Sequence, residues 1–340
     1  MTIGNGSGKA APLLEVRGLS VGFETQGGVL PAVEDVGFAL YPGDILGVVG
    51  ESGSGKTVTV SALVGLLADN ARITSGEVIY GGRNLLDLSA AELETVRGEE
   101  IAMVFQDPMT SLNPVMRVGS QIAEALRVHG ASRARARHRA VELLELVGIP
   151  DPRERFRQFP HEMSGGMRQR VVIAIAIANR PSVLVADEPT TALDVTIQAQ
   201  VLEVLAAGCG AAGSSMILVT HDLGVIAEVA NRVAVMYAGR IVETGTVEEI
   251  FGRPRHPYTI GLFTSLPRLD SDLGHLAPIP GTPPTLAARP PGCAFHPRCY
   301  LSAGRDLCRS QTTELVHLES GQSGACHFIS ETAGSEGTRP

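Results

Sequence analysis

The sequence predicts an α/β fold, and two patterns in it point to this class. Three short runs are continuously apolar and rich in β-branched residues, namely "ILGVVG", "SVLVAD" and "SMILVT". Such runs are typical of strands buried on both faces of a parallel sheet. Segments with helical spacing precede or follow each run, so we expect a central sheet with right-handed crossover connections.

Segments of different character surround this core. Residues 1–12 are polar and predict a flexible leader without the apolar centre of a secretory signal. Residues 13–39 alternate apolar and polar residues with glycines between, which predicts short antiparallel strands. In residues 107–163 the strand signals vanish, and "VGSQIAEALRVHG" and "RHRAVELLELVGIP" place apolar residues at helical spacing. We therefore expect an inserted helical subdomain there.

The composition changes after about Gly252, where proline is concentrated in "RPRHPYT", "PIPGTPP" and "ARPPGC". Periodicity is weak in this part of the chain. The expected organisation is a main domain over residues 13–252, followed by an irregular C-terminal extension over residues 253–340.

Bulk charge and hydropathy restrict the function classes. The formal net charge of −8 argues against a general nucleic-acid binder, which needs a basic surface to neutralise phosphates. The alternating arginines of "SRARARHRA" are more typical of a solvated helix face. The longest apolar run, "VVIAIAIA", has eight residues, whereas a membrane helix needs about 20. We expect no membrane span and a cytosolic chain.

The stretch "GESGSGKT" matches the phosphate-loop pattern GxxxxGK[ST], and it lies between the apolar runs "ILGVV" and "VTVSALVGLL". Its glycines let backbone N–H groups converge on phosphate oxygens at the positive end of the following helix. Lys56 is expected to reach the β- and γ-phosphates, and the Thr57 hydroxyl to bind Mg²⁺. The expected nucleotide-binding residues here are Gly50, Glu51, Ser52, Gly53, Ser54, Gly55, Lys56, Thr57 and Val58.

A second motif is the acidic pair that ends the run "SVLVADEP". An acid at a strand end can hold Mg²⁺, and its neighbour, which the pleat aims differently, can accept a proton from the attacking water. We assign the metal role to Asp187 and the general-base role to Glu188. A solvated acidic pair is the plainer alternative.

A third motif is "MSGGMRQR", where Ser164, Gly165 and Gly166 precede an apolar helix. A hydroxyl and backbone N–H groups at a helix start form an anion-binding arrangement. Because the phosphate loop already encloses its own nucleotide, this second anion-binding arrangement has an obvious use only if it contacts the nucleotide of another subunit. An ordinary helix start is the alternative.

Together these motifs resemble the ATPase subunits of ATP-binding-cassette (ABC) transporters, over residues 13 to about 252. "MSGGMRQR" is similar to the family's signature motif, Gln106 in "MVFQDP" to the Q-loop, and Asp194 in "TTALD" to the D-loop. His221 in "LVTHD" resembles the switch histidine, and Phe23 lies where the adenine-stacking aromatic is found. The resemblance implies ATP and Mg²⁺ as ligands, with Gln106 near the metal.

The segments "RHPYT" and "MTSLNP" and the signature methionine, Met167, resemble one of the two ATPase subunits of dipeptide and oligopeptide importers. This resemblance implies a second homologous ATPase subunit, two permease subunits and an extracytoplasmic solute-binding protein. It places the chain peripherally on the cytoplasmic face of the cell membrane. Met167 stands where glutamine is usual, so the two composite ATP sites are expected to be unequal.

Two other functions fit parts of the pattern. A cassette ATPase acting on DNA or ribosomes commonly has two cassettes or a coiled-coil insertion, and the acidic charge opposes it. A regulatory cassette that binds but hardly hydrolyses ATP is disfavoured because Lys56, Asp187, Glu188 and His221 are all present. The transported solute is left open among dipeptides, oligopeptides, nickel complexes and sugars.

Four of the five cysteines lie in the last 48 residues, at Cys293, Cys299, Cys308 and Cys326. A cytosolic location disfavours disulfides, and a proline-rich segment with weak periodicity needs another source of fixed shape. We expect a [4Fe-4S] cluster, in line with peptide-importer ATPases that have a similar tail. Zinc is an alternative, although the spacing lacks the CxxC element common in zinc sites, and free thiols or disulfides are another. A mixed site could also be completed by His296, His317 and His327.

Overall fold

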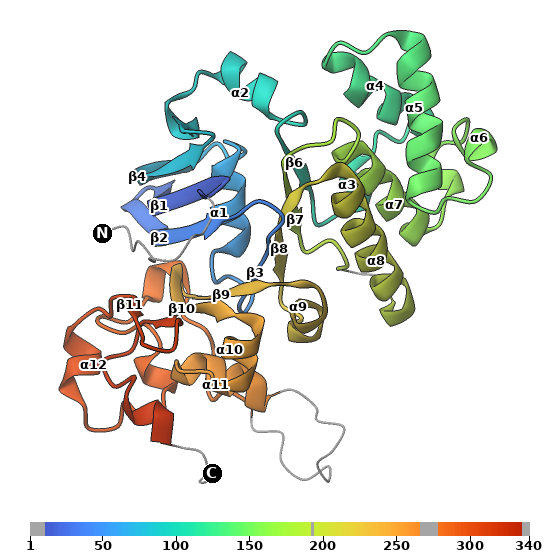
Figure 1. Ribbon diagram of the computed structural model, residues 1–340. Helices are drawn as coiled ribbons and strands as arrows, with labels where there is room; N and C mark the ends of the chain where they lie inside the picture. Colours follow the sequence, from blue (N-terminus) through green and yellow to red (C-terminus); the bar gives the residue numbers. More distant parts are fainter. Residues whose placement is uncertain (1–10, 192–193, 266–277, 335–340) are drawn as a thin grey trace. The chain divides into compact units, whose positions relative to one another are not determined.

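The computed structural model describes residues 11–191, 194–265 and 278–334 (Figure 1). The chain divides into two compact units that interleave along the sequence. The first unit contains Met1–Leu14, Ala39–Ile45 and Ile79–Val219, and the second contains Glu15–Phe38, Leu46–Val78 and Thr220–Pro340. The sequential domain boundaries expected from the sequence remain a prediction, and nearly all of the expected leader lies outside the described residues.

The first unit contains three parallel strands, β6 (Ile101–Val104), β7 (Val183–Asp187) and β8 (Ser215–Thr220). β6 pairs with β7 and β7 with β8, both in parallel. Every residue of β7 and β8 is buried, which is why these strands have no polar alternation. Two of the continuous apolar runs are thus confirmed as buried parallel strands.

Helices make up most of the rest of the first unit. They are α2 (Ala90–Val96), α3 (Pro108–Ser111), α4 (Val118–Val128), α5 (Arg133–Leu146), α6 (Pro152–Arg155), α7 (Gly165–Ala176) and α8 (Val195–Ala212). α7 packs against α3, α4, α5 and α8 (Figure 1). Within the described parts of the chain, none of the helices combines the length and apolar character that a bilayer crossing requires.

The arginine-rich run predicted to form a solvated helix face lies in α5. Arg133, Arg135 and Arg137 are exposed, whereas Ala136 and Ala140 on the other side of the helix are buried. α5 packs against α4 and α7, which cover its buried side. The basic run is therefore one face of an amphipathic helix.

The second unit begins with a sheet in which β2 (Gly28–Leu40), β1 (Leu14–Thr25) and β4 (Ala71–Tyr80) are neighbours. β4 ends in an antiparallel pairing with β5 (Arg83–Asn84), where both partners belong to the first unit. Buried and exposed residues interchange along β1, as in a sheet with one solvated face. This is the antiparallel subdomain that the alternating pattern predicted.

A second set of strands carries the phosphate loop. β3 (Ile45–Val49) pairs in parallel with β9 (Arg232–Tyr237), and β10 (Arg240–Thr246) pairs antiparallel with β9. The phosphate loop follows β3 and leads into α1 (Lys56–Leu63). The strand, loop and helix expected around the motif are therefore present.

The C-terminal region, residues 253–340, extends this set of strands, which the sequence analysis did not predict. β12 (Ser323–Gly324) pairs antiparallel with β10, and β11 (Val316–His317) pairs with β12. The region is thus attached to the rest of the second unit by backbone hydrogen bonds as well as by side chains.

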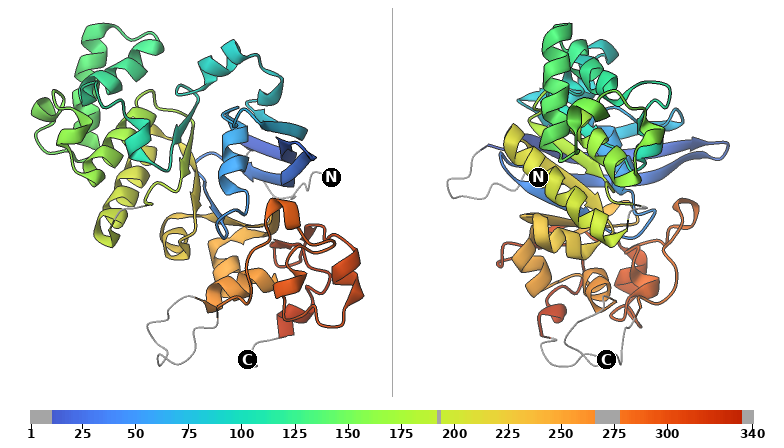
Figure 2. Two further views of the ribbon diagram at one scale, coloured as in Figure 1. Left: turned by 180° about the vertical axis from the view of Figure 1, so that it is seen from behind. Right: turned by 90° about the vertical axis from the view of Figure 1, so that its right-hand side faces the viewer.

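Short helices complete the second unit. They are α9 (Leu223–Val229), α10 (Val247–Gly252), α11 (Pro257–Thr264) and α12 (Asp306–Ser310), with 3₁₀ turns at Leu286–Ala288, His296–Arg298 and Glu331–Gly334. α10 packs on β9 and β10. Both views of Figure 2 show the segment from α10 onward, coloured orange to red, gathered in one part of the molecule.

Candidate nucleotide site

The phosphate loop is held in shape by its own lysine. Lys56 is only 4% exposed, and its ammonium donates hydrogen bonds to the carbonyls of Gly50 (2.8 Å) and Glu51 (3.1 Å). A buried ammonium needs such acceptors, because leaving it unpaired in the interior is costly. The loop thus surrounds the amine that was expected to reach the phosphates.

Two glycines of the loop are required by the backbone geometry. A Cβ at Gly50 would lie 2.1 Å from the Met236 carbonyl oxygen, so β9 leaves no room for a side chain there. Gly55 starts α1 with φ 102°, a conformation that side chains disfavour. The motif therefore needs its glycines for close approach and for the turn into the helix.

Glu51 is fixed from several directions by residues of the same unit. Its backbone N–H donates to the Tyr258 hydroxyl (2.9 Å), and its carboxylate binds the Arg298 guanidinium at 2.6 and 3.0 Å. Neither partner could be predicted from the sequence. Tyr258 lies in "RHPYT" and Arg298 lies between Cys293 and Cys299, but no pattern in these segments indicates that they reach the phosphate loop.

The acidic pair lies at the end of β7 in the first unit. Asp187 is 2% exposed, whereas Glu188 is half-buried and adopts a left-handed backbone conformation with φ 45°. The Glu188 carboxylate accepts hydrogen bonds from Gln106 Nε2 (3.3 Å) and Thr191 Oγ1 (3.0 Å). The structure thus brings together Gln106 and Glu188, which the sequence placed 82 residues apart.

The change of direction after Asp187 has a structural cause. The Glu188 backbone N–H donates to the Val219 carbonyl at 2.9 Å, which continues the pairing of β7 with β8. The positive φ then turns the chain away from the strand. The two carboxylates consequently have different surroundings, as the separate roles assigned to them require.

The Ser-Gly-Gly motif is the start of α7. Ser164 is the N-cap, and its hydroxyl accepts the Met167 N–H at 3.3 Å. A Cβ at Gly166 would lie 2.7 Å from the Ile197 side chain, so the glycine lets α7 approach α8. Asp194 is exposed and caps α8 by accepting the Ile197 N–H at 3.0 Å. The signature and D-loop segments are therefore neighbours through Ile197.

The remaining expected residues lie in the second unit, in or next to its strands and in the phosphate loop. Phe23 is half-buried near the end of β1, and His221 is exposed directly after β8. Of the loop residues, Ser52, Gly53 and Thr57 are exposed and Val58 is half-buried.

The "RHPYT" segment is built around a buried acid of β10. Glu243 is 0% exposed, and its carboxylate accepts the backbone N–H groups of Arg255 (2.6 Å) and His256 (2.8 Å). Burial raises the pKa of Glu243. His256 is 1% exposed, and its Nδ1 accepts the Tyr258 N–H at 3.1 Å. Burial lowers the pKa of His256 to about 3.

All five cysteines are free thiols. Burial, with additional repulsion from the other thiols, raises the pKa of Cys299 to about 12 and that of Cys326 to about 11. The Cys293 N–H donates to the Cys308 carbonyl at 2.9 Å. The four C-terminal cysteines therefore lie near one another, while Cys209 is separately buried in α8.

The four C-terminal cysteines do not form a metal site in the described part of the structure. Among residues 11–191, 194–265 and 278–334, no group of three or more His, Cys, Asp or Glu side chains is placed to hold a metal ion. The expected iron-sulfur or zinc site thus has the right donors but lacks the expected arrangement.

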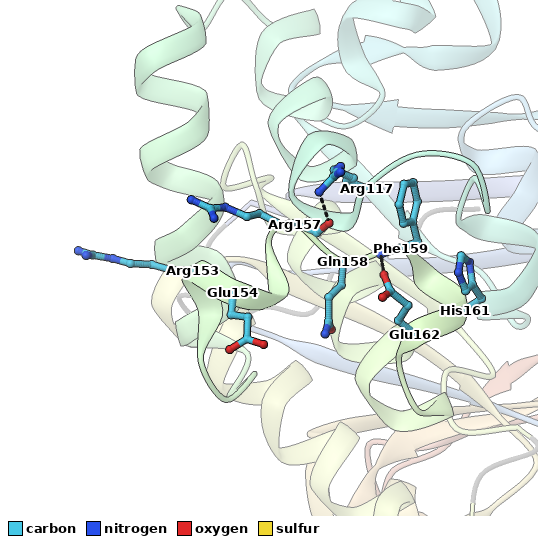
Figure 3. A pocket seen from close by; sticks show the side chains of 8 residues that line it. All are labelled: Arg117, Arg153, Glu154, Arg157, Gln158, Phe159, His161 and Glu162. Atoms are coloured by element: carbon cyan, nitrogen blue, oxygen red, sulfur yellow. Dashed lines mark hydrogen bonds between the residues drawn. The ribbon is translucent and has the colours of Figure 1, made fainter.

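A separate cavity of about 750 Å³ lies in the helical part of the first unit (Figure 3). Its walls include Arg117, which donates to the Arg157 carbonyl (2.7 Å) and lies 5.2 Å from the centre of the Phe159 ring. The Phe159 N–H donates to Glu162 at 2.7 Å. None of the residues expected at the nucleotide site lines this cavity.

The fold, the phosphate loop, the acidic strand end and the capped Ser-Gly-Gly helix define an ABC-type ATPase cassette. The family described as ABC transporter matches residues 33–191. The family described as the oligopeptide/dipeptide transporter C-terminal region matches residues 242–308. The chain belongs to the ABC transporter ATPases and carries the C-terminal region of the oligopeptide and dipeptide transporter subunits. In this family, ATP hydrolysis is coupled to transport.

Curated relatives match over most of their length. A putative peptide import ATP-binding protein of Brucella abortus is 54% identical over 94% of this chain and 95% of its own. The dipeptide transport ATP-binding protein of Lactococcus lactis is 56% identical over 84% of this chain and 82% of its own. The oligopeptide transport ATP-binding protein of Bacillus subtilis is 57% identical, with 83% and 80% covered.

Solved structures show the same fold. An ATP-binding cassette solved as a dimer in a post-hydrolysis state with ADP and phosphate matches with a TM-score of 0.62 and 26% identity. The match covers 69% of this chain and 98% of that one.

Proposed function

We propose that this chain is the ATP-hydrolysing subunit that powers import of di- or oligopeptides. The observation that carries the proposal is the match of residues 242–308 to the C-terminal region of oligopeptide/dipeptide transporters. Relatives named for dipeptide, oligopeptide and peptide import support it. In this proposal residues 13–252 form the nucleotide-binding domain, with the helical subdomain at about 107–163, and residues 253–340 form the extension.

The phosphate loop is proposed to bind the ATP phosphates. Lys56 lies within the loop and can exchange its two carbonyl partners for phosphate oxygens. Backbone N–H groups at the start of α1 add to the positive field. Phe23 is proposed to stack on adenine, a contact worth about 1 kcal/mol.

The oxygen donors Thr57, Gln106 and Asp187 are proposed to hold Mg²⁺. Carboxylate, hydroxyl and amide oxygens are the ligands that Mg²⁺ prefers, so the donor set fits the ion. When bound, the ion neutralises charge on the phosphates. Glu188 is the proposed general base, held toward the Q-loop by the Gln106 contact at 3.3 Å. His221 is proposed to hydrogen-bond the γ-phosphate or to orient Glu188.

The signature residues Ser164, Gly165, Gly166 and Met167 are proposed to contact the ATP of a second cassette, with Asp194 close to that interface. The dimeric state of the similar cassette structure supports pairing of this kind. Met167 offers a thioether where an amide could donate and accept hydrogen bonds. We therefore infer a partner that is a different chain and two composite sites of unequal activity.

The further partners are proposed to be two permease subunits and an extracytoplasmic solute-binding protein, with the chain peripheral on the cytoplasmic face of the membrane. No role in nucleic-acid binding is proposed. Function as a transporter subunit requires attachment to permeases.

The test is reconstitution of the chain with its partner ATPase, permeases and solute-binding protein in vesicles. We expect labelled di- or oligopeptides to enter the vesicles in an ATP-dependent manner and to stimulate hydrolysis. Nickel complexes and sugars serve as competing solutes. Stimulation by one of these, with no response to any peptide, would contradict peptide import while leaving the ATPase assignment intact.

We further propose that Cys293, Cys299, Cys308 and Cys326 bind a [4Fe-4S] cluster that orders the C-terminal region, with zinc as the alternative. The support is the donor set of four free, neighbouring thiols. Because burial raises their pKa, binding must release protons. Anaerobic purification with iron, sulfide and zinc analysis and an absorption spectrum tests this. A colourless protein with stoichiometric zinc, or without metal, excludes the cluster.

A further inference from the structure

Besides the Tyr258 hydrogen bond, one ion pair joins the C-terminal region to the phosphate loop. Arg298 Nη1 lies 2.6 Å from Glu51 Oε2, and Nη2 lies 3.0 Å from Oε1. This two-point arrangement fixes both the distance and the plane of the carboxylate, which a lysine could not do. The side chains are 6% and 26% exposed, so water screens the pair little.

Arg298 is itself held rigidly. Its Nε donates to the Pro280 carbonyl at 2.9 Å, and its guanidinium lies 5.8 Å from the Tyr237 ring centre and 6.0 Å from that of Phe295. Tyr237, Tyr258 and Phe295 pack together with ring centres 4.6 to 5.4 Å apart. Because Tyr237 belongs to β9 and Phe295 to the C-terminal region, the cluster joins the two.

The contacts continue from Glu51 into the nucleotide-binding machinery. The Glu51 N–H donates to Tyr258, its carboxylate binds Arg298, and its carbonyl accepts the Lys56 ammonium at 3.1 Å. Each polar group of this loop residue therefore has a partner. Arg298 is therefore connected to Lys56 through a single intervening residue, Glu51.

A neighbouring ion pair offers a comparison. Arg289, also in the C-terminal region, binds Glu34 of β2 at 2.6 Å, and Arg240 joins the same carboxylate at 3.1 Å. This pair also joins the C-terminal region to the rest of the second unit. The Glu34 carboxylate makes its ion pairs with arginines outside the phosphate loop, and Glu34 connects to the loop through backbone hydrogen bonds to Gly239 and from Gly239 to Ser54. Removing Arg289 therefore weakens attachment without removing a direct side-chain contact to the loop.

We propose that Arg298 is a positioning residue that holds the phosphate loop in its nucleotide-binding conformation through Glu51. ATP affinity then depends on the folded C-terminal region, although that region contributes no phosphate-binding group in this assignment. The inference rests on the proposed role of the phosphate loop. If the fraction of molecules with a competent loop falls, the apparent affinity for ATP falls in the same proportion.

The test uses the full-length chain with Arg298→Met, and Arg289→Met as the matched control. We expect the dissociation constant for Mg·ATP to rise roughly tenfold for Arg298→Met, which corresponds to about 1.4 kcal/mol, and to change less than twofold for Arg289→Met. In the assembled transporter, the KM for ATP should rise while kcat at saturating ATP stays within about twofold, because bound nucleotide restores the loop. Circular dichroism checks that both variants fold.

Glu51→Gln and the Arg298→Met/Glu51→Gln double variant keep the test decisive if Arg298→Met folds poorly. The double variant should bind ATP about as weakly as the worse single variant, since both remove one interaction. Arg298→Lys should recover only part of the affinity. Equal dissociation constants for Arg298→Met and Arg289→Met, or additive effects in the double variant, would overturn the proposal. Failure of peptide import would not, because the comparison requires ATP binding alone.

Discussion

Acid should destabilise the second unit through His256, and His256→Asn should remove much of that effect. His256 is buried as the neutral base, since its Nδ1 accepts the Tyr258 N–H. Its pKa falls from 6.5 to about 3 through burial. Below about pH 6.5 the unfolded chain therefore binds a proton at this histidine that the folded chain does not bind. The free energy of unfolding consequently decreases as the pH falls from 6.5 toward 3.

The magnitude follows from the pH interval. Each pH unit below the unfolded pKa costs about 1.4 kcal/mol until the folded pKa is reached, so lowering the pH from 7 to 5 costs about 2 kcal/mol. This value holds for any folded pKa well below 5. Glu243 acts in the opposite direction, because its raised pKa lets the folded state take up a proton before the unfolded state does. Its contribution is common to the wild type and to His256→Asn, and it largely cancels in their difference.

The assay is urea unfolding followed by circular dichroism at pH 7 and pH 5, since the chain has no tryptophan to report fluorescence. Asn can still accept the Tyr258 N–H as a helix N-cap, so the variant keeps the local geometry. The exposed His161 provides the control, and His161→Asn should lose as much stability as the wild type. If His256→Asn loses the same free energy between the two pH values as the wild type, the reasoning is refuted.

Three further outcomes are expected. Glu188→Gln should slow hydrolysis by ~10²-fold or more with ATP binding retained, whereas Glu203→Gln on the exposed face of α8 should not; near-normal phosphate release from Glu188→Gln would contradict the general-base role. Removing the base from each of the two cassettes in turn should give unequal losses of uptake because of Met167, and equal losses would count against asymmetry. Gly50→Ala should weaken Mg·ATP binding at least tenfold, because the new Cβ would lie 2.1 Å from the Met236 carbonyl, while Gly252→Ala, with open space around it, should bind normally in equilibrium titrations.

The sequence predicted those elements whose burial is visible in a local pattern of residues. The runs that became β3, β7 and β8 are continuous and apolar because both faces of each strand are covered. Ser164 as a helix N-cap was visible for a similar reason, since the cap bond spans only three residues.

Long-range features escaped prediction. β11 and β12 have two residues each, too few to show a period of two. Glu243 resembles a solvent-facing strand residue in sequence, and only the fold shows it buried beneath the turn at His256. Arg298 lies between Cys293 and Cys299, in the stretch whose cysteines predicted a metal site. A single ion pair between residues 247 positions apart leaves no periodic signal in the sequence.

That separation has a consequence for synthesis of the chain. The phosphate loop is synthesised early, whereas Arg298, which binds the Glu51 carboxylate, is added 247 residues after Glu51. At about 5–20 residues per second, the interval is on the order of tens of seconds. Late in this interval, once His221 has been added, the nascent chain contains nearly every nucleotide-binding motif but lacks the contact proposed to hold the loop competent. Full ATP affinity would then be acquired only after Arg298 has been synthesised, so that shorter nascent chains compete poorly for nucleotide.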